Sequence, residues 1–106
     1  MPFGYKMVDG IVTIQQEKAE LVRKMFDAYI AGVSLIQMAK DLCKQGIPNA
    51  NGKPSWNHGS IGKILSNRKY TGDDFYPTIV TEEMFNTVKT CREKKNAELN
   101  RNTNYH

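Results

Sequence analysis

The order of apolar and polar positions along the chain predicts a pair of strands followed by helices. The segments 5–8 and 11–14 flank Asp9-Gly10, and glycine supplies the positive φ that the tight turn of a β-hairpin requires. From about Glu17 to Ala31 apolar residues recur at helical spacing, and Gly32 provides a C-terminal stop. The chain is therefore expected to open with a hairpin that leads into an amphipathic helix.

A second helix is expected directly after Ser34. Ser34 and Gln37 match a capping box at its start, and Gly46 with Ile47 fits a Schellman ending in which Ile47 packs back on the helix. The following segment, 49–54, is a loop by composition and is longer than the turn of a standard helix-turn-helix. The second and third helices are thus at most a stretched relative of that motif.

The stretch from Trp56 to Tyr70 predicts a third, short helix that leads into a basic, aromatic loop. Asn57 is a suitable N-cap, and Trp56 can fold onto Ile61 as a hydrophobic staple. The apolar stripe is Ile61, Ile64 and Leu65, and the opposite face, expected to meet solvent, carries Gly59, Gly62, Lys63 and Ser66. Each interior glycine costs about 1 kcal/mol relative to alanine. This bare face therefore predicts a close approach to another backbone, either DNA or a neighbouring segment of the same domain.

The C-terminal part predicts a second, short strand pair and a last helix. Residues 70–72 and 78–80 could supply the strands, with Pro77 keeping the second near an edge. Thr81 can cap a final helix with two glutamates in its first turn, and residues 100–106 are expected to be a frayed tail because they offer nothing to bury. The predicted fold is α+β, mostly helical, with about four helices, an N-terminal β-hairpin and a short second strand pair.

Composition limits what such a chain can be. With 106 residues, of which 40% are hydrophobic, residues 1–106 can bury one modest core and are expected to form a single domain. No apolar run has the length of a membrane span or the form of a signal peptide, so a cytoplasmic protein without a membrane partner is expected. Cys43 and Cys91 lack the Cys/His spacing of a zinc site, so neither a disulfide, a metal nor another cofactor is expected.

The charge is polarised along the chain, although its net value is only +4. Between Asp41 and Asp73 there is no acidic residue, while the basic residues of that interval are Lys44, Lys53, Lys63, Arg68 and Lys69. The segment 73–91 is acidic by the same count. A basic, acid-free stretch that also carries Trp, His, Asn and Tyr is what a phosphate-binding surface requires, so the charge favours nucleic acid as the partner.

A series of short motifs runs through the chain: Pro2-Phe3-Gly4-Tyr5, Asp9-Gly10, Val22 to Phe26 with Tyr29 and Gly32, Gly46-Ile47, Gly52, Trp56, Ile64-Leu65-Ser66-Asn67, Tyr70, Gly72 and Ile79-Val80-Thr81-Glu82 with Phe85. In order and spacing they resemble the recombinase domain of large serine recombinases from end to end. The resemblance implies a DNA-binding domain from enzymes that integrate, excise or transpose bacterial mobile elements.

The resemblance also implies what this chain lacks. Such recombinases carry a separate catalytic domain with a serine nucleophile and usually a later zinc-binding domain, and neither is present here. The chain is then expected to be a middle domain excised from a longer protein, without a catalytic residue and monomeric in isolation. Its expected partners are double-stranded DNA and the parent protein's catalytic and zinc-binding domains.

The third helix is the best candidate for the major groove, with the loop after it along the adjoining backbone. The residues expected to contact bases or phosphates are Lys53, Asn57, His58, Ser60, Lys63, Ser66, Arg68, Lys69 and Tyr70. Trp56, as the staple residue, is expected to serve the fold rather than to stack on a base.

Three alternatives stay open on the sequence alone. His58 could act as a general base and Asp73-Asp74 could hold a divalent metal, as in a nuclease, but no third carboxylate lies nearby in sequence. The bare face of the third helix could instead pack on a partner protein. The chain could also come from a transcription regulator, although a compact helix-turn-helix needs neither the long loop nor the opening hairpin.

Overall fold

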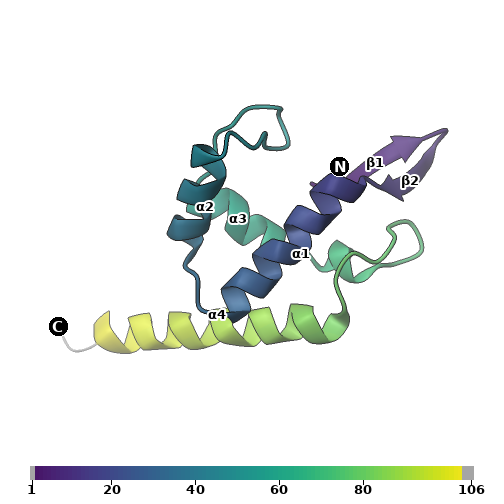
Figure 1. Ribbon diagram of the computed structural model, residues 1–106. Coiled ribbons are helices and arrows are strands. Elements are labelled where there is room, and N and C mark those ends of the chain that lie inside the picture. Colours follow the sequence, from purple (N-terminus) through teal and green to yellow (C-terminus); the bar gives the residue numbers. More distant parts are fainter. Residues whose placement is uncertain (1, 104–106) are drawn as a thin grey trace.

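The computed structural model describes the backbone of residues 2–103 and the side chains of residues 2–95. Its elements follow in the order β1 (Tyr5–Val8), β2 (Ile11–Ile14), α1 (Gln16–Ile30), α2 (Leu35–Lys44), α3 (His58–Leu65), a 3₁₀ helix η1 (Arg68–Thr71) and α4 (Glu82–Thr103). In Figure 1, α1 runs diagonally through the middle of the molecule, α2 and α3 lie on one side of it, and α4 runs below. The predicted α+β, mostly helical fold is confirmed.

The opening hairpin forms as predicted. β1 and β2 pair antiparallel with Val8 opposite Ile11, so Asp9 and Gly10 are the two residues of the turn. Both have a positive φ, 52° and 78°, as the primed turns that match strand twist require. Tyr5 at the base of the hairpin is buried while the rest of β1 is exposed, so the hairpin projects from the domain (Figure 1).

The caps of α2 agree with the sequence, with one difference. At its end, the Ile47 N–H donates to the Leu42 carbonyl at 3.1 Å in a Schellman motif. At its start, the Ser34 hydroxyl accepts from the Gln37 N–H at 3.1 Å. The Gln37 side chain donates to the Asp41 carboxylate at 2.9 Å instead of turning back to Ser34, so only half of the capping box forms.

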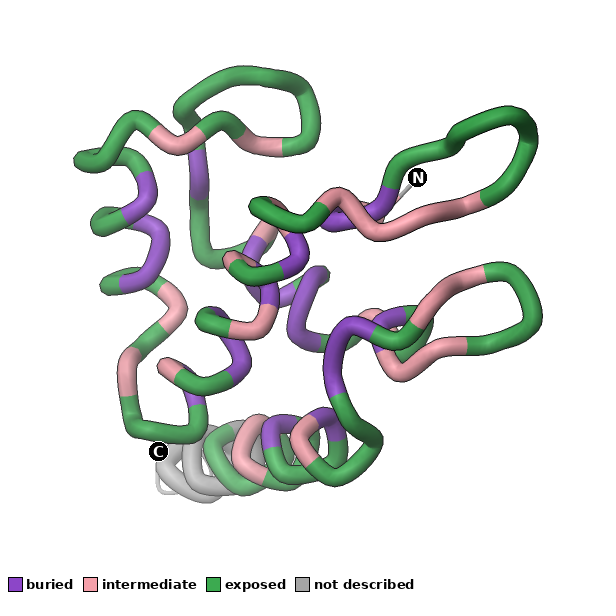
Figure 2. Tube along the Cα trace, turned by 45° about the vertical axis from the view of Figure 1, so that its right-hand side comes forward, coloured by how far each residue is buried: buried purple, intermediate pink, exposed green. Residues whose placement is uncertain are grey.

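The hydrophobic core is built around α1. The buried face of α1 consists of Ala19, Val22, Met25, Phe26 and Tyr29, and Figure 2 shows buried stretches of the other helices turned toward it. Tyr70 of η1 is only 1% exposed. Its ring meets Phe26 edge-on, with 6.5 Å between centroids, and its hydroxyl donates to the Phe3 carbonyl at 2.6 Å. Burial raises the pKa of Tyr70, which keeps this hydroxyl a donor over the whole physiological range.

Tyr5 joins the hairpin to the segment after α3. Its hydroxyl lies 2.6 Å from the Pro77 carbonyl and 3.0 Å from the Lys69 carbonyl, and its ring stacks on Tyr70 with 5.7 Å between centroids. Burial, with a smaller contribution from the Asp73 carboxylate, raises the pKa of Tyr5 to about 12. The N-terminal strand and η1 are therefore held together by two neutral tyrosines.

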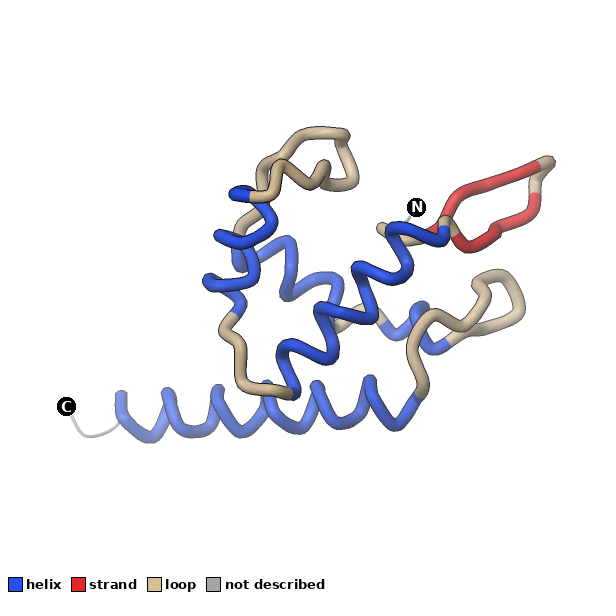
Figure 3. Tube along the Cα trace, viewed as in Figure 1, coloured by secondary structure: helices blue, strands red, loops and turns tan. Residues whose placement is uncertain are grey.

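One part of the predicted fold is corrected: the described residues contain no second strand pair. Residues 68–71 form η1, and the N–H groups of Ile79 and Val80 both donate to the Tyr70 carbonyl, at 2.8 and 3.0 Å. A strand pair needs successive residues to alternate their bonds, whereas here one carbonyl takes both donors. The intervening turn is fixed by the Asp73 carboxylate, which accepts from the N–H groups of Phe75 and Tyr76 at 2.8 Å each. In Figure 3 the hairpin alone is drawn as strand.

The last helix begins as predicted, because the Thr81 hydroxyl accepts from the Met84 N–H at 3.1 Å. α4 continues through Thr103, so the predicted tail of 100–106 begins within a helix, and residues 104–106 lie outside the described residues. Among the helices described, none combines the length and the apolar character needed to cross a membrane.

Candidate nucleic-acid interface

α3 is a short helix whose start is held by reciprocal side-chain bonds. Asn57 Oδ1 accepts from the Ser60 N–H at 2.9 Å, and Ser60 Oγ accepts from the Asn57 N–H at 3.1 Å. This complete capping box confirms Asn57 as the N-cap. Ser60 Oγ also donates to the Asn57 carbonyl at 2.8 Å. The Ser60 hydroxyl proton is therefore engaged, while the side-chain NH₂ of Asn57 can still donate to a ligand.

Trp56 serves the fold, as predicted. Its side chain is 7% exposed, and its indole N–H donates to the Ile47 carbonyl at 2.8 Å. The ring meets Phe3 edge-on, with 5.3 Å between centroids. The Trp56 N–H lies 3.2 Å from Cys43 Sγ. Trp56 thus ties α2, the loop after it and the N-terminal segment to the start of α3.

The exposed face of α3 is narrower than predicted. Gly59, Lys63 and Ser66 are exposed, but Gly62 is buried, and this corrects its expected place on the solvent side. Arg92 of α4 covers it: Nη1 donates to the Gly62 carbonyl at 2.9 Å, and a Cβ at residue 62 would lie 3.2 Å from Nη2. The glycine therefore serves a close approach within the domain, one of the two alternatives that the sequence left open.

We expect Gly62→Ala to destabilise the domain by about 0.5–2 kcal/mol. The methyl group would force Arg92 Nη2, 3.2 Å away, to shift, and losing the charge-assisted hydrogen bond of this side chain, worth ~1.5–3 kcal/mol, would cost more than the ~1 kcal/mol of helix propensity gained. In an Arg92→Ala background the same substitution should instead stabilise by up to about 1 kcal/mol. Denaturant unfolding of the four variants measures this cycle. A gain in stability from Gly62→Ala with Arg92 present would contradict the contact.

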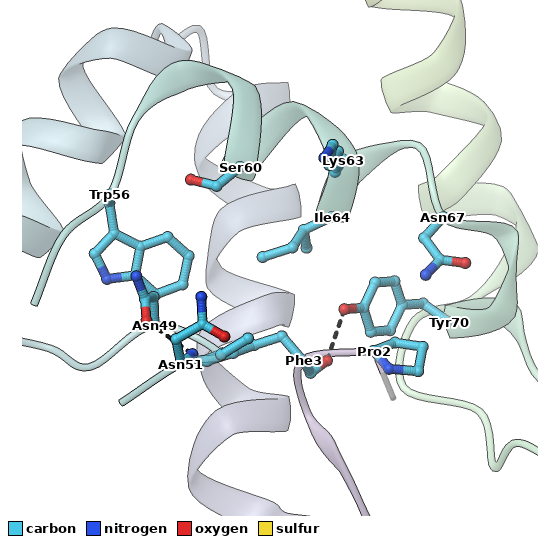
Figure 4. Close-up of a pocket in the computed structure, with 11 residues that line it drawn as sticks. Pro2, Phe3, Asn49, Asn51, Trp56, Ser60, Lys63, Ile64, Asn67 and Tyr70 are labelled. Atoms are coloured by element: carbon cyan, nitrogen blue, oxygen red, sulfur yellow. Dashed lines mark hydrogen bonds between the residues drawn. The ribbon is translucent and has the colours of Figure 1, made fainter. Parts of the chain in front are cut away.

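One side of the exposed face of α3 borders an open hollow of about 340 Å³, which we call the loop hollow. Its floor is formed by buried side chains, and its rim by polar ones: Phe3, Trp56, Ile64 and Tyr70 below, and Asn51, Ser60, Lys63 and Asn67 above. Figure 4 shows Ser60, Lys63 and Asn67 on the α3 side and Asn51 on the opposite side. Amide groups at such a rim can both donate and accept, which is the capacity that base edges require.

At the start of α3, a hollow between α2 and α3 brings Lys40 together with Asn57 and His58. Lys40 is exposed, but it lies before Asp41 and so outside the acid-free interval from which the sequence predicts the contacts. The packing of α2 on α3 nevertheless places the charge of Lys40 on the same surface as Asn57 and His58.

Two other predicted contacts are engaged inside the domain. Tyr70 is corrected: its side chain is in the core and its hydroxyl is bonded to the Phe3 carbonyl, so it cannot meet a phosphate without opening the core. The Ser66 hydroxyl donates to the Gly62 carbonyl at 2.9 Å, which leaves it only as an acceptor for an outside ligand.

The three remaining basic residues of the predicted set lie in different surroundings. Lys53 is exposed on the loop between α2 and α3, where the Asn49 side chain accepts from its N–H at 3.1 Å. Arg68 lies over the Phe85 ring at 5.2 Å. Lys69 lies over the Tyr76 ring at 5.0 Å, in a hollow that also contains acidic side chains. Among these three basic residues Lys69 is the least suited to phosphate, because Arg68, which lines the same hollow, also lines a second hollow with Lys89 and Arg92.

One of the carboxylates considered for metal binding has a role in the fold. The Asp73 carboxylate is engaged in the turn that precedes α4. Within residues 2–95, no three His, Cys, Asp or Glu side chains gather as a metal site would require. Cys43 and Cys91 are free thiols.

Known proteins share the fold described above. A family model described as Recombinase matches residues 16–95. A solved structure titled "Crystal Structure of a LSR-DNA Complex" has a TM-score of 0.71 at 22% identity, covering 88% of this chain and 31% of that chain. Another, "Sequence Requirements of the Listeria innocua prophage attP site", has a TM-score of 0.64 at 24% identity, covering 83% and 40%. No curated protein matches. The two structures share the fold, and this chain spans less than half the length of either.

Proposed function

Because the chain belongs to the Recombinase family, we propose that it holds the attachment-site DNA of a large serine recombinase while a separate catalytic domain exchanges the strands. The two structures that share its fold, one of an LSR–DNA complex and one concerning a prophage attP site, support this proposal. Under the proposal the domain contributes binding and orientation, and none of its own side chains reacts.

The exposed face of α3 carries the proposal. Lys63 stands near its centre, and the acid-free sequence around it leaves no carboxylate on α3. Lys40 and His58 lie together at the N-terminal end of the helix, where the unpaired backbone N–H groups add partial positive charge. A helix face of this kind attracts phosphate and can enter the major groove.

The loop hollow suggests how bases would be reached. With α3 in the groove, Lys63 can donate to guanine O6 and N7 or to a phosphate. The amide of Asn51 can pair with the donor and acceptor atoms of adenine, while Asn67, on the opposite side of the same hollow, has its NH₂ group to donate because its Oδ1 already accepts from the Lys69 N–H at 3.1 Å. Lys40 and Lys53 then flank the helix as phosphate contacts.

A protein-interaction surface on the same helix is less well supported. That alternative relied on a bare stripe of Gly59, Gly62 and Ser66, but Arg92 covers Gly62. What is left exposed is a lysine among polar groups, which suits a phosphate backbone better than an apolar partner helix.

The salt dependence of binding tests the proposal. If about five phosphates are neutralised, the logarithm of the affinity for duplex DNA should fall with the logarithm of salt concentration with a slope near −4.5. DNA from the ends of the mobile element should bind more tightly than random duplex at the same salt. A slope close to zero, or no binding to either duplex, would rule the proposal out.

A further inference from the structure

We infer that the hollow between the end of α3 and α4 binds a phosphate of the DNA backbone, an inference that rests on the proposed function. This hollow, which we call the α4 hollow, has a volume of about 450 Å³. Its lining combines three cations, one carboxylate, one hydroxyl and two apolar side chains: Arg68, Lys89, Arg92, Glu93, Ser66, Leu65 and Phe85. Of these residues, the sequence alone predicts only Ser66 and Arg68 as DNA contacts.

Arg92 is held in place before any ligand arrives. Its Nη1 is bonded to the Gly62 carbonyl, which fixes the guanidinium against α3. A guanidinium has five N–H donors, so this bond leaves the others available to the hollow. Because the side chain is already positioned, an anion that binds it has less conformational entropy to remove.

Arg68 is positioned in a similar way by an aromatic ring. Its guanidinium lies over Phe85, which is only 4% exposed and forms part of the floor of the hollow. Lys89 comes from α4, three residues before Arg92, and is exposed. The hollow therefore has one guanidinium held by a hydrogen bond, one guanidinium lying over a ring and one exposed ammonium group, a combination that suits the oxygens of a phosphate.

Continuity with α3 favours a DNA phosphate over a protein carboxylate. Ser66 belongs both to the exposed face of α3 and to the lining of the α4 hollow, so an anion bound there lies beside the strand that α3 would contact. Lys63, which lines the loop hollow, lies three residues before Ser66, which lines the α4 hollow. DNA placed on α3 would thus cover the loop hollow on one side and the α4 hollow on the other.

The test compares single substitutions that remove opposite charges from the α4 hollow. Lys89→Ala should weaken binding to a random-sequence duplex about two- to fivefold and flatten the salt slope by about 0.9. Glu93→Gln should strengthen binding, because it removes the one carboxylate. Lys94→Ala, an exposed lysine of α4 outside the lining, is the matched control and should change affinity less than twofold, roughly. Unfolding midpoints of all three variants should stay close to the parent value.

The outcomes separate this inference from the proposed function. If Lys63→Ala weakens DNA binding while Lys89→Ala and Glu93→Gln leave it unchanged, the α4 hollow is not a phosphate site and the proposed function stands. If the parent domain binds no duplex, both fail. A polyglutamate peptide serves as the second probe: peptide binding that depends on Lys89 while DNA binding does not would assign the hollow to an acidic protein segment and overturn the inference.

Discussion

Replacing Trp56 with alanine is expected to destabilise the domain by about 3–5 kcal/mol, the cost typical of deleting a large buried aromatic side chain. The ring is packed against Phe3, and its N–H satisfies the Ile47 carbonyl. Its loss would leave a cavity under the loop hollow and remove the bond to Ile47, whereas the backbone bonds between residue 56 and Cys43 of α2 would remain. Because small domains have only ~5–15 kcal/mol of total stability, Trp56→Ala should unfold at a clearly lower denaturant concentration.

Trp56→Phe separates a structural role from base stacking. Phenylalanine keeps an aromatic ring but leaves the Ile47 carbonyl without its partner, which should cost about 1–3 kcal/mol. The variant should remain folded at low temperature and bind duplex DNA with nearly the parent affinity. A stable Trp56→Phe domain that had lost most of its DNA affinity would show that the indole contacts DNA directly.

Lys63→Glu is expected to lower the affinity for duplex DNA by more than about tenfold, because it replaces an attraction to phosphate with a repulsion at the centre of the surface. Lys63 is exposed and forms no part of the core, so the unfolding midpoint should change little. Fluorescence anisotropy at two salt concentrations measures the loss, which should be larger at the lower salt.

The matched control is Lys24→Glu, which makes the same charge change on the exposed side of α1. It alters the net charge of the domain equally but lines neither the loop hollow nor the α4 hollow. Its effect on affinity should therefore be small. Equal losses from the two variants would mean that net charge alone, without a defined surface on α3, accounts for binding.

The features that the sequence predicted well are those decided by neighbouring residues. The turn at Asp9-Gly10 depends on two positive φ angles, and the N-cap at Asn57 depends on a residue three positions away. The Schellman ending at Ile47 is similarly local. Each of these motifs satisfies backbone donors and acceptors within a few residues, so a short window of sequence is enough to predict it.

The features that the sequence did not predict depend on contacts between residues that are far apart in the chain. A helical wheel predicts that Gly62 is exposed. It is buried because α4 packs against α3 and brings Arg92, thirty residues later, onto the Gly62 carbonyl. The sequence places Tyr70 in a basic loop. In the structure its side chain lies in the core, where its hydroxyl donates to the carbonyl of Phe3, near the other end of the chain. Lys40 joins the candidate surface for the same reason, through the packing of two helices.

Contacts between distant residues also explain why the predicted second strand pair does not form. Residues 70–72 and 78–80 are side by side, as expected, but the bulk of Tyr70 in the core and the Asp73 turn set their geometry. One carbonyl then receives two N–H donors and the ladder cannot continue. Propensity located the two segments, and tertiary packing decided their conformation.

The most direct test of the central claim is to follow backbone amide signals by NMR while the labelled domain is titrated with duplex DNA. The account predicts that the largest shifts fall on residues 57–67 and Lys40, with smaller ones along the α4 hollow, while the hairpin tip at residues 7–11 stays unchanged. Shifts concentrated on the hairpin tip or on the turn at 73–76, with α3 unaffected, would contradict it.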